Sequence, residues 1–263
     1  MKTTLQIKLL PDEAQRSALK ETMQVFNDAC NAIAEIAFKE KCASKFALQK
    51  LVYEDVRKQF GLSAQLTIRA IAKVVEAYKR DKSKPCFFKP TGAVVYDQRI
   101  LSFKGLDKAS LVTMQGRLSI PIQMGQYQRV QWHRAKGQAD LVQVNGTFFL
   151  LVVIDTPEAP PIDPSSFIGV DLGIAKVATD SDGESFCGST VERVRQRLQS
   201  RGTRSAKRHL KRIRRKEAQF RRNQNHVISK RLVEKAKDTG RGMALEELKH
   251  IRERTTVNGT EIR

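Results

Sequence analysis

One stretch of the sequence combines a large excess of basic residues with a regular apolar spacing. Residues 193–222 contain fourteen lysines and arginines and a single acid, Glu217. A disordered basic tail is not expected to have periodic apolar residues. Here apolar residues recur every seven positions, at Ala206, Ile213, Phe220 and Val227. The spacing therefore predicts a packed helix, or a helical hairpin broken near Gly202, over about residues 190–238, with a cationic outer face.

Short apolar runs on both sides of this helix predict a sheet that the helix bridges. FIGVD (residues 167–171), KVATD and ESFCG come before it, and Met243–Leu245 follows it. If the first three runs form a meander and the fourth pairs in parallel with the first, the helix is a crossover connection, right-handed by the usual rule. Asp171 and Glu246 then end two neighbouring strands.

Two carboxylates side by side at strand ends repel each other and favour a divalent cation between them. Oxygen-ligated Mg²⁺ ions can hydrolyse phosphodiesters, one ion activating water and another stabilising the leaving oxygen. Taken singly, Asp171 or Glu246 is a turn former or an ion-pair partner, and that alternative stays open. The basic helix beside such a site would hold nucleic-acid phosphates through Lys207, Arg208, Lys211, Arg212, Arg214, Arg215, Arg221 and Arg222.

The first half of the chain predicts a strand, three helices and then a sheet. Residues 1–10 alternate as a strand, a helix-period stripe starts at Asp12, and further helices are expected over about 46–60 and after an N-cap at Ser63. Residues 86–158 hold five short apolar or alternating runs, YQRVQWHR among them, broken at glycines that include Gly125 and Gly137. This spacing predicts an antiparallel sheet or small barrel, with Trp132 and Phe148-Phe149 in its core or edge.

The proline-rich segment 156–166 predicts a domain boundary, which gives domains of residues 1–160 and 161–263. The 263-residue chain has a formal net charge of +20, which indicates polyanionic partners, either nucleic acid or an anionic membrane surface. No apolar run approaches the roughly 18 residues that span a bilayer, so we expect a cytoplasmic protein with no membrane partner. Four scattered cysteines without a CxxC pair favour reduced, mostly buried thiols.

The order GVDLGIAKVATDSDG, basic helix, ALEELKHIRER resembles the TnpB (OrfB) proteins of bacterial insertion sequences, which are related to the type V CRISPR effectors. The N-terminal half is similar as well, through NDACNAIAEIAF, SAQLTIRAIAKVVEAYKR, YDQRILSFKG and GRLSIPI. The resemblance implies an α+β or α/β chain with a wedge β-barrel, a helical region inserted at about residues 11–82, and a RuvC-like nuclease domain of RNase H fold.

The family's activity is Mg²⁺-dependent DNA cleavage guided by an RNA from the transposon end. The resemblance therefore implies transposase-associated chemistry, with guide RNA and duplex DNA as partners and the bacterial nucleoid as the place of action. Asp171 matches the family's first metal-binding aspartate, and Glu246 matches its catalytic glutamate. Glu247 stands where the family usually has Asp or Asn.

The sequence departs from the family pattern after Glu246. The family continues with a zinc ribbon and a third catalytic aspartate, and neither motif is found before Arg263. We therefore expect an incomplete nuclease domain in a C-terminally truncated protein that cleaves poorly. A nuclease-inactive, RNA-guided DNA-binding repressor is an alternative. A remote alternative is an ATP-binding protein of the sugar-kinase and actin superfamily, because IGVDLGIAK also resembles its first phosphate-binding strand.

Overall fold

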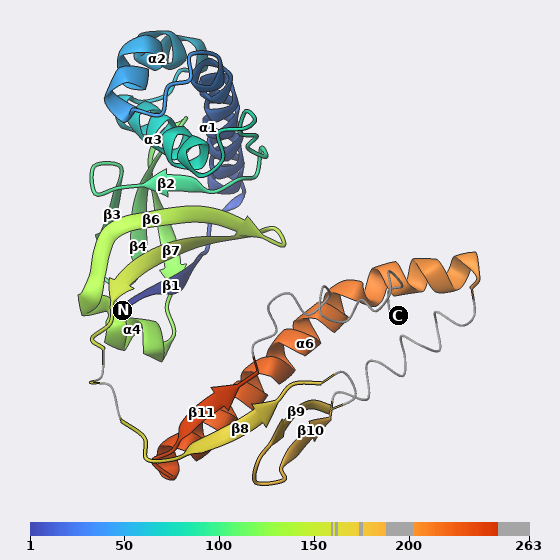
Figure 1. Cartoon of the computed structure of the whole chain (residues 1–263). Helices are drawn as coiled ribbons and strands as arrows, with labels where there is room; N and C mark the ends of the chain where they lie inside the picture. The colour runs from blue at the N-terminus through green and yellow to red at the C-terminus, as the bar shows by residue number, and fades with distance from the viewer. Residues whose placement is uncertain (159, 161–162, 174–175, 188–201, 247–263) are drawn as a thin grey trace. The chain divides into compact units, whose positions relative to one another are not determined.

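The computed structural model describes residues 1–158, 160, 163–173, 176–187 and 202–246, without the side chains of residues 136, 187 and 212–217. The chain forms two compact units, Met1–Ala159 and Pro160–Arg263. Each unit mixes helices and strands around its own core (Figure 1). Among the described helices, none combines the length and the apolar character that crossing a membrane requires.

The first unit contains a seven-stranded, nearly closed antiparallel sheet (Figure 1). β1 (Lys2–Leu9) lies in its middle and pairs with β5 on one side and β7 on the other. The strand order is β2-β6-β7-β1-β5-β4-β3. The other strands are β2 (Val94–Tyr96), β3 (Leu101–Lys104), β4 (Lys108–Thr113), β5 (Gly116–Gln123), β6 (Ala135–Val144) and β7 (Thr147–Asp155). The prediction of an antiparallel sheet is confirmed.

Three helices lie together beside this sheet (Figure 1): α1 (Glu13–Lys39), α2 (Lys45–Phe60) and α3 (Ala64–Arg80). The Asp12 carboxylate accepts a hydrogen bond from the Gln15 amide at 2.8 Å, and the Ser63 hydroxyl accepts one from the Leu66 amide at 3.4 Å. Both side chains satisfy donors that a helix start leaves unpaired. The predicted N-cap at Ser63 is confirmed, and Asp12, where the helical period was expected to start, is an N-cap as well. The predicted stripe of α1 is fully buried: Leu19, Met23, Phe26, Cys30, Ile33 and Ala37.

Two expectations for the first unit were wrong. The run YQRVQWHR is not a strand but α4 (Gln126–Gln131) followed by a 3₁₀ turn, η1 (Trp132–Arg134). Gln128 accepts a hydrogen bond from the Gly125 amide at 2.6 Å and so closes the first helical turn. The alternation of the run did not indicate this local contact. Gly137 does not end a strand; it lies inside β6 where the register with β7 shifts.

The thiols are less buried than the sequence predicted. Cys30 is fully buried, and burial raises the pKa of its thiol to about 12. Cys42 and Cys86 are free and only half-buried. The side chain of Cys187 lies outside the described residues.

The second unit contains a four-stranded sheet of order β10-β9-β8-β11. β8 (Phe167–Asp171), β9 (Lys176–Asp180) and β10 (Ser185–Cys187) form an antiparallel meander. β11 (Gly242–Leu245) returns after α6 (Arg204–Asp238) and pairs in parallel with β8. The predicted meander, crossover helix and parallel return strand are confirmed within the described residues, and residues 188–201 of the expected helical region lie outside them.

The packed face of α6 differs from the predicted seven-residue stripe. Phe220 and Val227 are 39% and 51% exposed, whereas Ala206 is buried. The helix packs on the sheet through Ile228, Leu232 and Ala236, which contact a core of Ile168, Val170 and Ala178. A helix that lies on a sheet does not supercoil, so its buried face follows a step of four residues and not a strict heptad.

Candidate functional site

The parallel pairing of β8 and β11 places two carboxylates at the same edge of the second unit's sheet. Leu245 lies opposite Val170 in the register, so Glu246 and Asp171 are the next residues along the two strands. Both residues are exposed. The sequence therefore predicted correctly that the two acids end neighbouring strands. Their catalytic and metal-binding roles stay predictions.

The chemistry of these two acids fits a hard divalent cation. Within the described residues, neither carboxylate has a hydrogen-bond or ion-pair partner, so its oxygens are available as ligands. The same residues contain no group of three or more His, Cys, Asp or Glu placed to hold a metal. Asp171 and Glu246 could thus supply two carboxylate ligands to one Mg²⁺, with water completing its shell.

An apolar cavity of about 360 Å³ lies beside these strand ends. α6 lines one side through Ile228, Leu232 and Val233, and β8, β9 and β11 line the other. Val170 and Leu172, the neighbours of Asp171 in the chain, both line it. Asp171 itself does not line the cavity, and its side chain is exposed.

The N-terminal half of α6 presents the predicted phosphate-binding cations. Lys207, Arg208, Lys211, Arg221 and Arg222 are exposed, and Arg212, Arg214 and Arg215 belong to the same helix, although their side chains lie outside the described residues. With about 1.5 Å of rise per residue, residues 207–222 extend roughly 22 Å, which spans many phosphates of a duplex. Their role in nucleic-acid binding stays a prediction.

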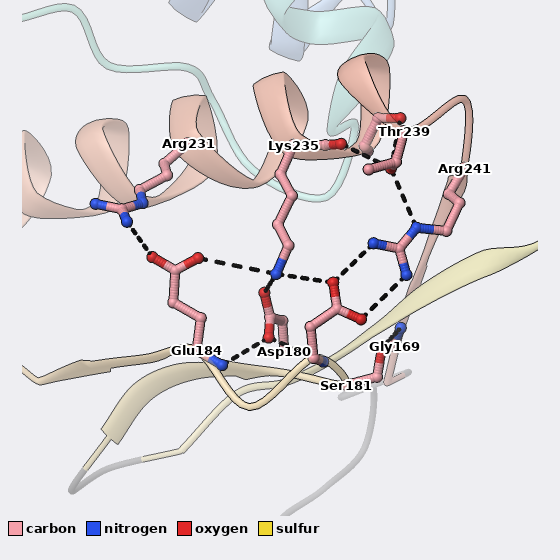
Figure 2. Close-up of polar contacts among 10 residues, drawn as sticks. Gly169, Asp180, Ser181, Glu184, Arg231, Lys235, Thr239 and Arg241 are labelled. Atoms are coloured by element: carbon pink, nitrogen blue, oxygen red, sulfur yellow. Dashed lines mark hydrogen bonds and ion pairs between the residues drawn. The ribbon is translucent and has the colours of Figure 1, made fainter.

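The sequence analysis missed an ionic cluster that ties the far end of α6 to the β9–β10 turn (Figure 2). We call this cluster the turn latch: Asp180, Asp182, Glu184, Arg231, Lys235 and Arg241. The Lys235 ammonium lies 2.5 Å from Asp180 Oδ2 and 2.8 Å from Asp182 Oδ2. Arg241 binds both oxygens of Asp182, at 3.0 and 2.7 Å, and Arg231 lies 2.6 Å from Glu184 Oε1.

Asp180 is the centre of the turn latch. Its side chain is fully buried, and its Oδ1 accepts hydrogen bonds from the amides of Asp182 at 3.0 Å and Glu184 at 2.8 Å. The hydrogen bond from Lys235 lowers the pKa of Asp180, and the bond from Arg241 lowers the pKa of Asp182. Reciprocally, the bond to Asp180 raises the pKa of Lys235. These acids are thus ion-pair partners that hold the turn against α6.

The turn latch could have been found only in part from the sequence. The DSDG turn was visible, and its acids lie between two predicted strands. Their partners are more than forty residues further along the chain, on a helix in which basic residues are common, so no local pattern selects Lys235 or Arg241.

Comparisons with known proteins give weak structural matches. No family model matches the chain, and no curated protein matches it. A solved structure entitled "Cryo-EM structure of the Cas12f1-sgRNA-target DNA complex" matches with a TM-score of 0.36 and 14% identity, over 97% of this chain and 75% of that one. "Cryo-EM structure of CRISPR-Cas12f Ternary Complex" matches with a TM-score of 0.37 and 12% identity, over 90% and 64%. At this similarity the matches carry no argument about function.

Proposed function

We propose that the protein is a transposon-encoded, RNA-guided DNA-binding protein of the TnpB type that carries a RuvC-like, nuclease-type site. In this proposal the cations of α6 bind the phosphates of guide RNA and duplex DNA, and Asp171 with Glu246 binds Mg²⁺. The motif resemblance supports the family, and the net charge of +20 supports a polyanionic partner. Such a protein acts in the cytoplasm, at the nucleoid.

The observation that carries this proposal is the β8–β11 pairing bridged by α6. It brings two carboxylates, distant in sequence, to adjacent parallel strand ends, and it makes the basic helix the connection between them. A site of this kind joins a metal-binding edge to a phosphate-binding surface within one unit. If α6 were only a solvated basic helix, the position of Asp171 and Glu246 at adjacent strand ends would have no functional reason.

The two carboxylates would hold Mg²⁺, which when bound supplies charge neutralisation at a phosphate and a more acidic water. The cations of α6 hold the backbone of the strand and set its position.

Binding without efficient cleavage is the second candidate function, that of a repressor. Two-metal hydrolysis needs acidic ligands shared between two ions, and Asp171 with Glu246 supplies two carboxylates. We therefore expect the RNA-bound protein of residues 1–263 to nick duplex DNA poorly in Mg²⁺. Robust cleavage that is lost in Asp171→Ala would contradict this second candidate and favour an active nuclease.

Binding of Mn²⁺, followed by electron paramagnetic resonance, tests the proposed metal site. Asp171→Asn and Glu246→Gln should each weaken Mn²⁺ binding at least about tenfold, since each removes one charged ligand. Asp238→Asn, which changes an exposed acid of the same unit, is the matched control and should bind as the parent protein does. Equal Mn²⁺ binding by all four proteins would refute the site. Retention on heparin, and not on ATP-agarose, separates the proposal from the ATP-binding alternative.

A further inference from the structure

The sheet of the second unit has two faces with different side chains. Ile168 and Val170 of β8 and Ala178 of β9 are buried in the core that includes α6. Successive side chains of a strand point to opposite faces, so Asp171 and Thr179 belong to the face that points away from α6. Asp171 is exposed and Thr179 is half-buried, in agreement with this placement.

The strand register aligns four polar residues across this outer face. Asp171 lies opposite Thr179, and Thr179 lies opposite Ser185. Glu246 is the next residue after the pairing of β11 with β8 and continues the line on the other side of Asp171. We call this line the polar row: two carboxylates on β8 and β11, then two hydroxyl groups on β9 and β10.

The two hydroxyl groups of the polar row have a hydrogen-bond donor to spare. Thr179 Oγ1 and Ser185 Oγ lie 3.3 Å apart and form one hydrogen bond with each other. Each hydroxyl carries one proton, so whichever of the two donates in this bond, the proton of the other stays available. Among the described residues, neither hydroxyl has a further hydrogen-bond partner. The pair can therefore donate to a ligand.

The position of this donor favours a ligand bound at the carboxylates. Side chains directly opposite each other in an antiparallel pair have Cβ atoms about 5 Å apart, so the Thr179 hydroxyl reaches the surroundings of the Asp171 carboxylate. It makes no hydrogen bond with that carboxylate in the structure. A neutral hydroxyl next to two acids adds a donor without adding charge.

Small residues flank the polar row. Gly169 lies two residues before Asp171 on the same face, and its partner on β11 is Ala244. The Gly169 amide donates to Ser181 Oγ at 3.2 Å, a contact that Figure 2 shows. None of these side chains extends beyond a methyl or hydroxyl group, so the sheet surface beside the acids is open to a sugar-phosphate backbone.

We propose that Thr179 and Ser185 are positioning residues, whose hydroxyl pair donates a hydrogen bond to a phosphate oxygen of a nucleic-acid strand beside Asp171 and Glu246. Serine and threonine hydroxyls are common phosphate contacts in nucleic-acid interfaces. This role rests on the proposed function, because it assumes that the two acids bind a divalent cation. It places the phosphate on the β9 and β10 side of the acids. DNA and RNA share this phosphate chemistry.

Binding of short strands with and without a divalent cation tests this role. The probes are labelled four-nucleotide strands of DNA and of RNA, and fluorescence anisotropy measures their affinity for the full chain in Mn²⁺ and in a chelator. Thr179→Val keeps the shape of threonine without its hydroxyl, whereas Thr179→Ser keeps the hydroxyl. Ser229→Ala is the matched control for Ser185→Ala, because Ser229 is an exposed serine of α6 outside the polar row. Circular dichroism checks the folding of each variant.

We expect Mn²⁺ to tighten strand binding at least about fivefold in the parent protein and less than about twofold in Thr179→Val, since the variant lacks a hydrogen bond to a charged oxygen. Ser185→Ala should reduce the gain as well, whereas Thr179→Ser and Ser229→Ala should keep it. The affinity for Mn²⁺ itself, followed by electron paramagnetic resonance, should stay within about twofold in every variant, because the carboxylates are intact. The probe with the larger gain identifies DNA or RNA as the ligand.

Three outcomes would overturn this role, and they separate it from the proposed function. If Thr179→Val keeps the full gain while Mn²⁺ binds, the hydroxyl pair does not hold the phosphate, and the proposed function stands. If Thr179→Val loses affinity for Mn²⁺, the hydroxyl acts on the carboxylates and not on the phosphate. If the parent protein binds no Mn²⁺, the proposed function fails, and the role of the hydroxyl pair fails with it.

Discussion

The two halves of α6 both carry basic side chains, but in different surroundings. In the N-terminal half, Lys207, Arg208 and Lys211 are exposed. In the C-terminal half, Arg231 and Lys235 are in ion pairs with acids of the β9–β10 turn, and Leu232 between them is buried in the core. The difference comes from the facing element, because among the described residues it is the second half that meets a turn rich in carboxylates. Cations of one helix thus serve the fold at one end and remain available to a ligand at the other.

Charge reversal in the N-terminal half should have the largest effect. We expect Lys207→Glu, Arg208→Glu, Lys211→Glu and Arg212→Glu combined to weaken RNA and duplex DNA binding at least about 100-fold and to reduce the slope of log K against log salt by about 3. Gel-shift titrations at several salt concentrations measure both. The control is the same change to glutamate at four exposed lysines of the first unit: Lys20, Lys39, Lys50 and Lys58. Equal effects of the two sets on binding would contradict a binding role for α6.

Loss of the buried leucine in the C-terminal half should destabilise the second unit next most strongly. Leu232→Ala removes a side chain that is 6% exposed, and we expect it to cost about 2–4 kcal/mol of unfolding free energy. Its neighbour Val233 is 49% exposed, so Val233→Ala should cost less than about 0.5 kcal/mol. Hydrogen exchange of the β8 amides measures both variants, and similar values would mean that α6 does not pack through Leu232.

Breaking the turn latch should have a smaller but clear effect. Asp180→Ala leaves Lys235 without its closest partner and removes two hydrogen bonds from the turn. We expect exchange of the β9 and β10 amides to become at least about tenfold faster, since a buried ion pair loses one member. Lys230→Ala, which affects an exposed pair with Glu234 at 3.6 Å, should change exchange less than twofold. Equal exchange in the two variants would show that the latch does not hold the turn.

The latch also predicts how the second unit responds to pH. Because its ion pairs lower the pKa values of Asp180 and Asp182 in the folded state, their stabilisation is complete above about pH 5 and is lost as the pH falls through those lowered values. The pKa of Lys235 is raised, so its stabilisation is present below about pH 10 and is lost above that. Hydrogen exchange measured between pH 3 and 7 should become faster in the parent protein as the pH falls, because this stabilisation is lost. The exchange of Asp182→Asn should depend less on pH.

The smallest expected effect is on the fluorescence of Trp132, which lies in η1 of the first unit. Its ring packs edge-on against Phe103 with centroids 4.6 Å apart and adjoins the core of the first unit, as the sequence predicted. We therefore expect its fluorescence to stay within about 10% of its initial value when RNA binds. Strong quenching would instead indicate contact between Trp132 and a base.

The sequence predicted elements well where local patterns decide the structure. The strand at residues 2–9, the capped starts of α1 and α3, and the β8–β9–β10 meander all follow from periodicity and turn residues. The parallel return of β11 could also be inferred, because the acids at two strand ends gave it a chemical reason. The prediction of a strand for YQRVQWHR was wrong. Its residues alternate as in a strand, but the Gln128 side chain accepts a hydrogen bond from the Gly125 amide, which favours a helical turn.

Long-range partners were beyond the reach of sequence patterns. Lys235 is one of many basic residues on α6, and its selection by Asp180 depends on the three-dimensional packing of the helix on the sheet. The seven-residue stripe was misleading because its spacing fits a coiled coil better than a helix on a sheet.

During synthesis, β8 leaves the ribosome well before the strand that pairs with it in parallel. The register joins Gly242 to Phe167, so all of α6 is translated between the two partners. Until β11 emerges, the edge of β8 has no neighbour, and a long loop must still close before the pairing forms. A nascent chain therefore completes its basic helix while its second sheet is still open.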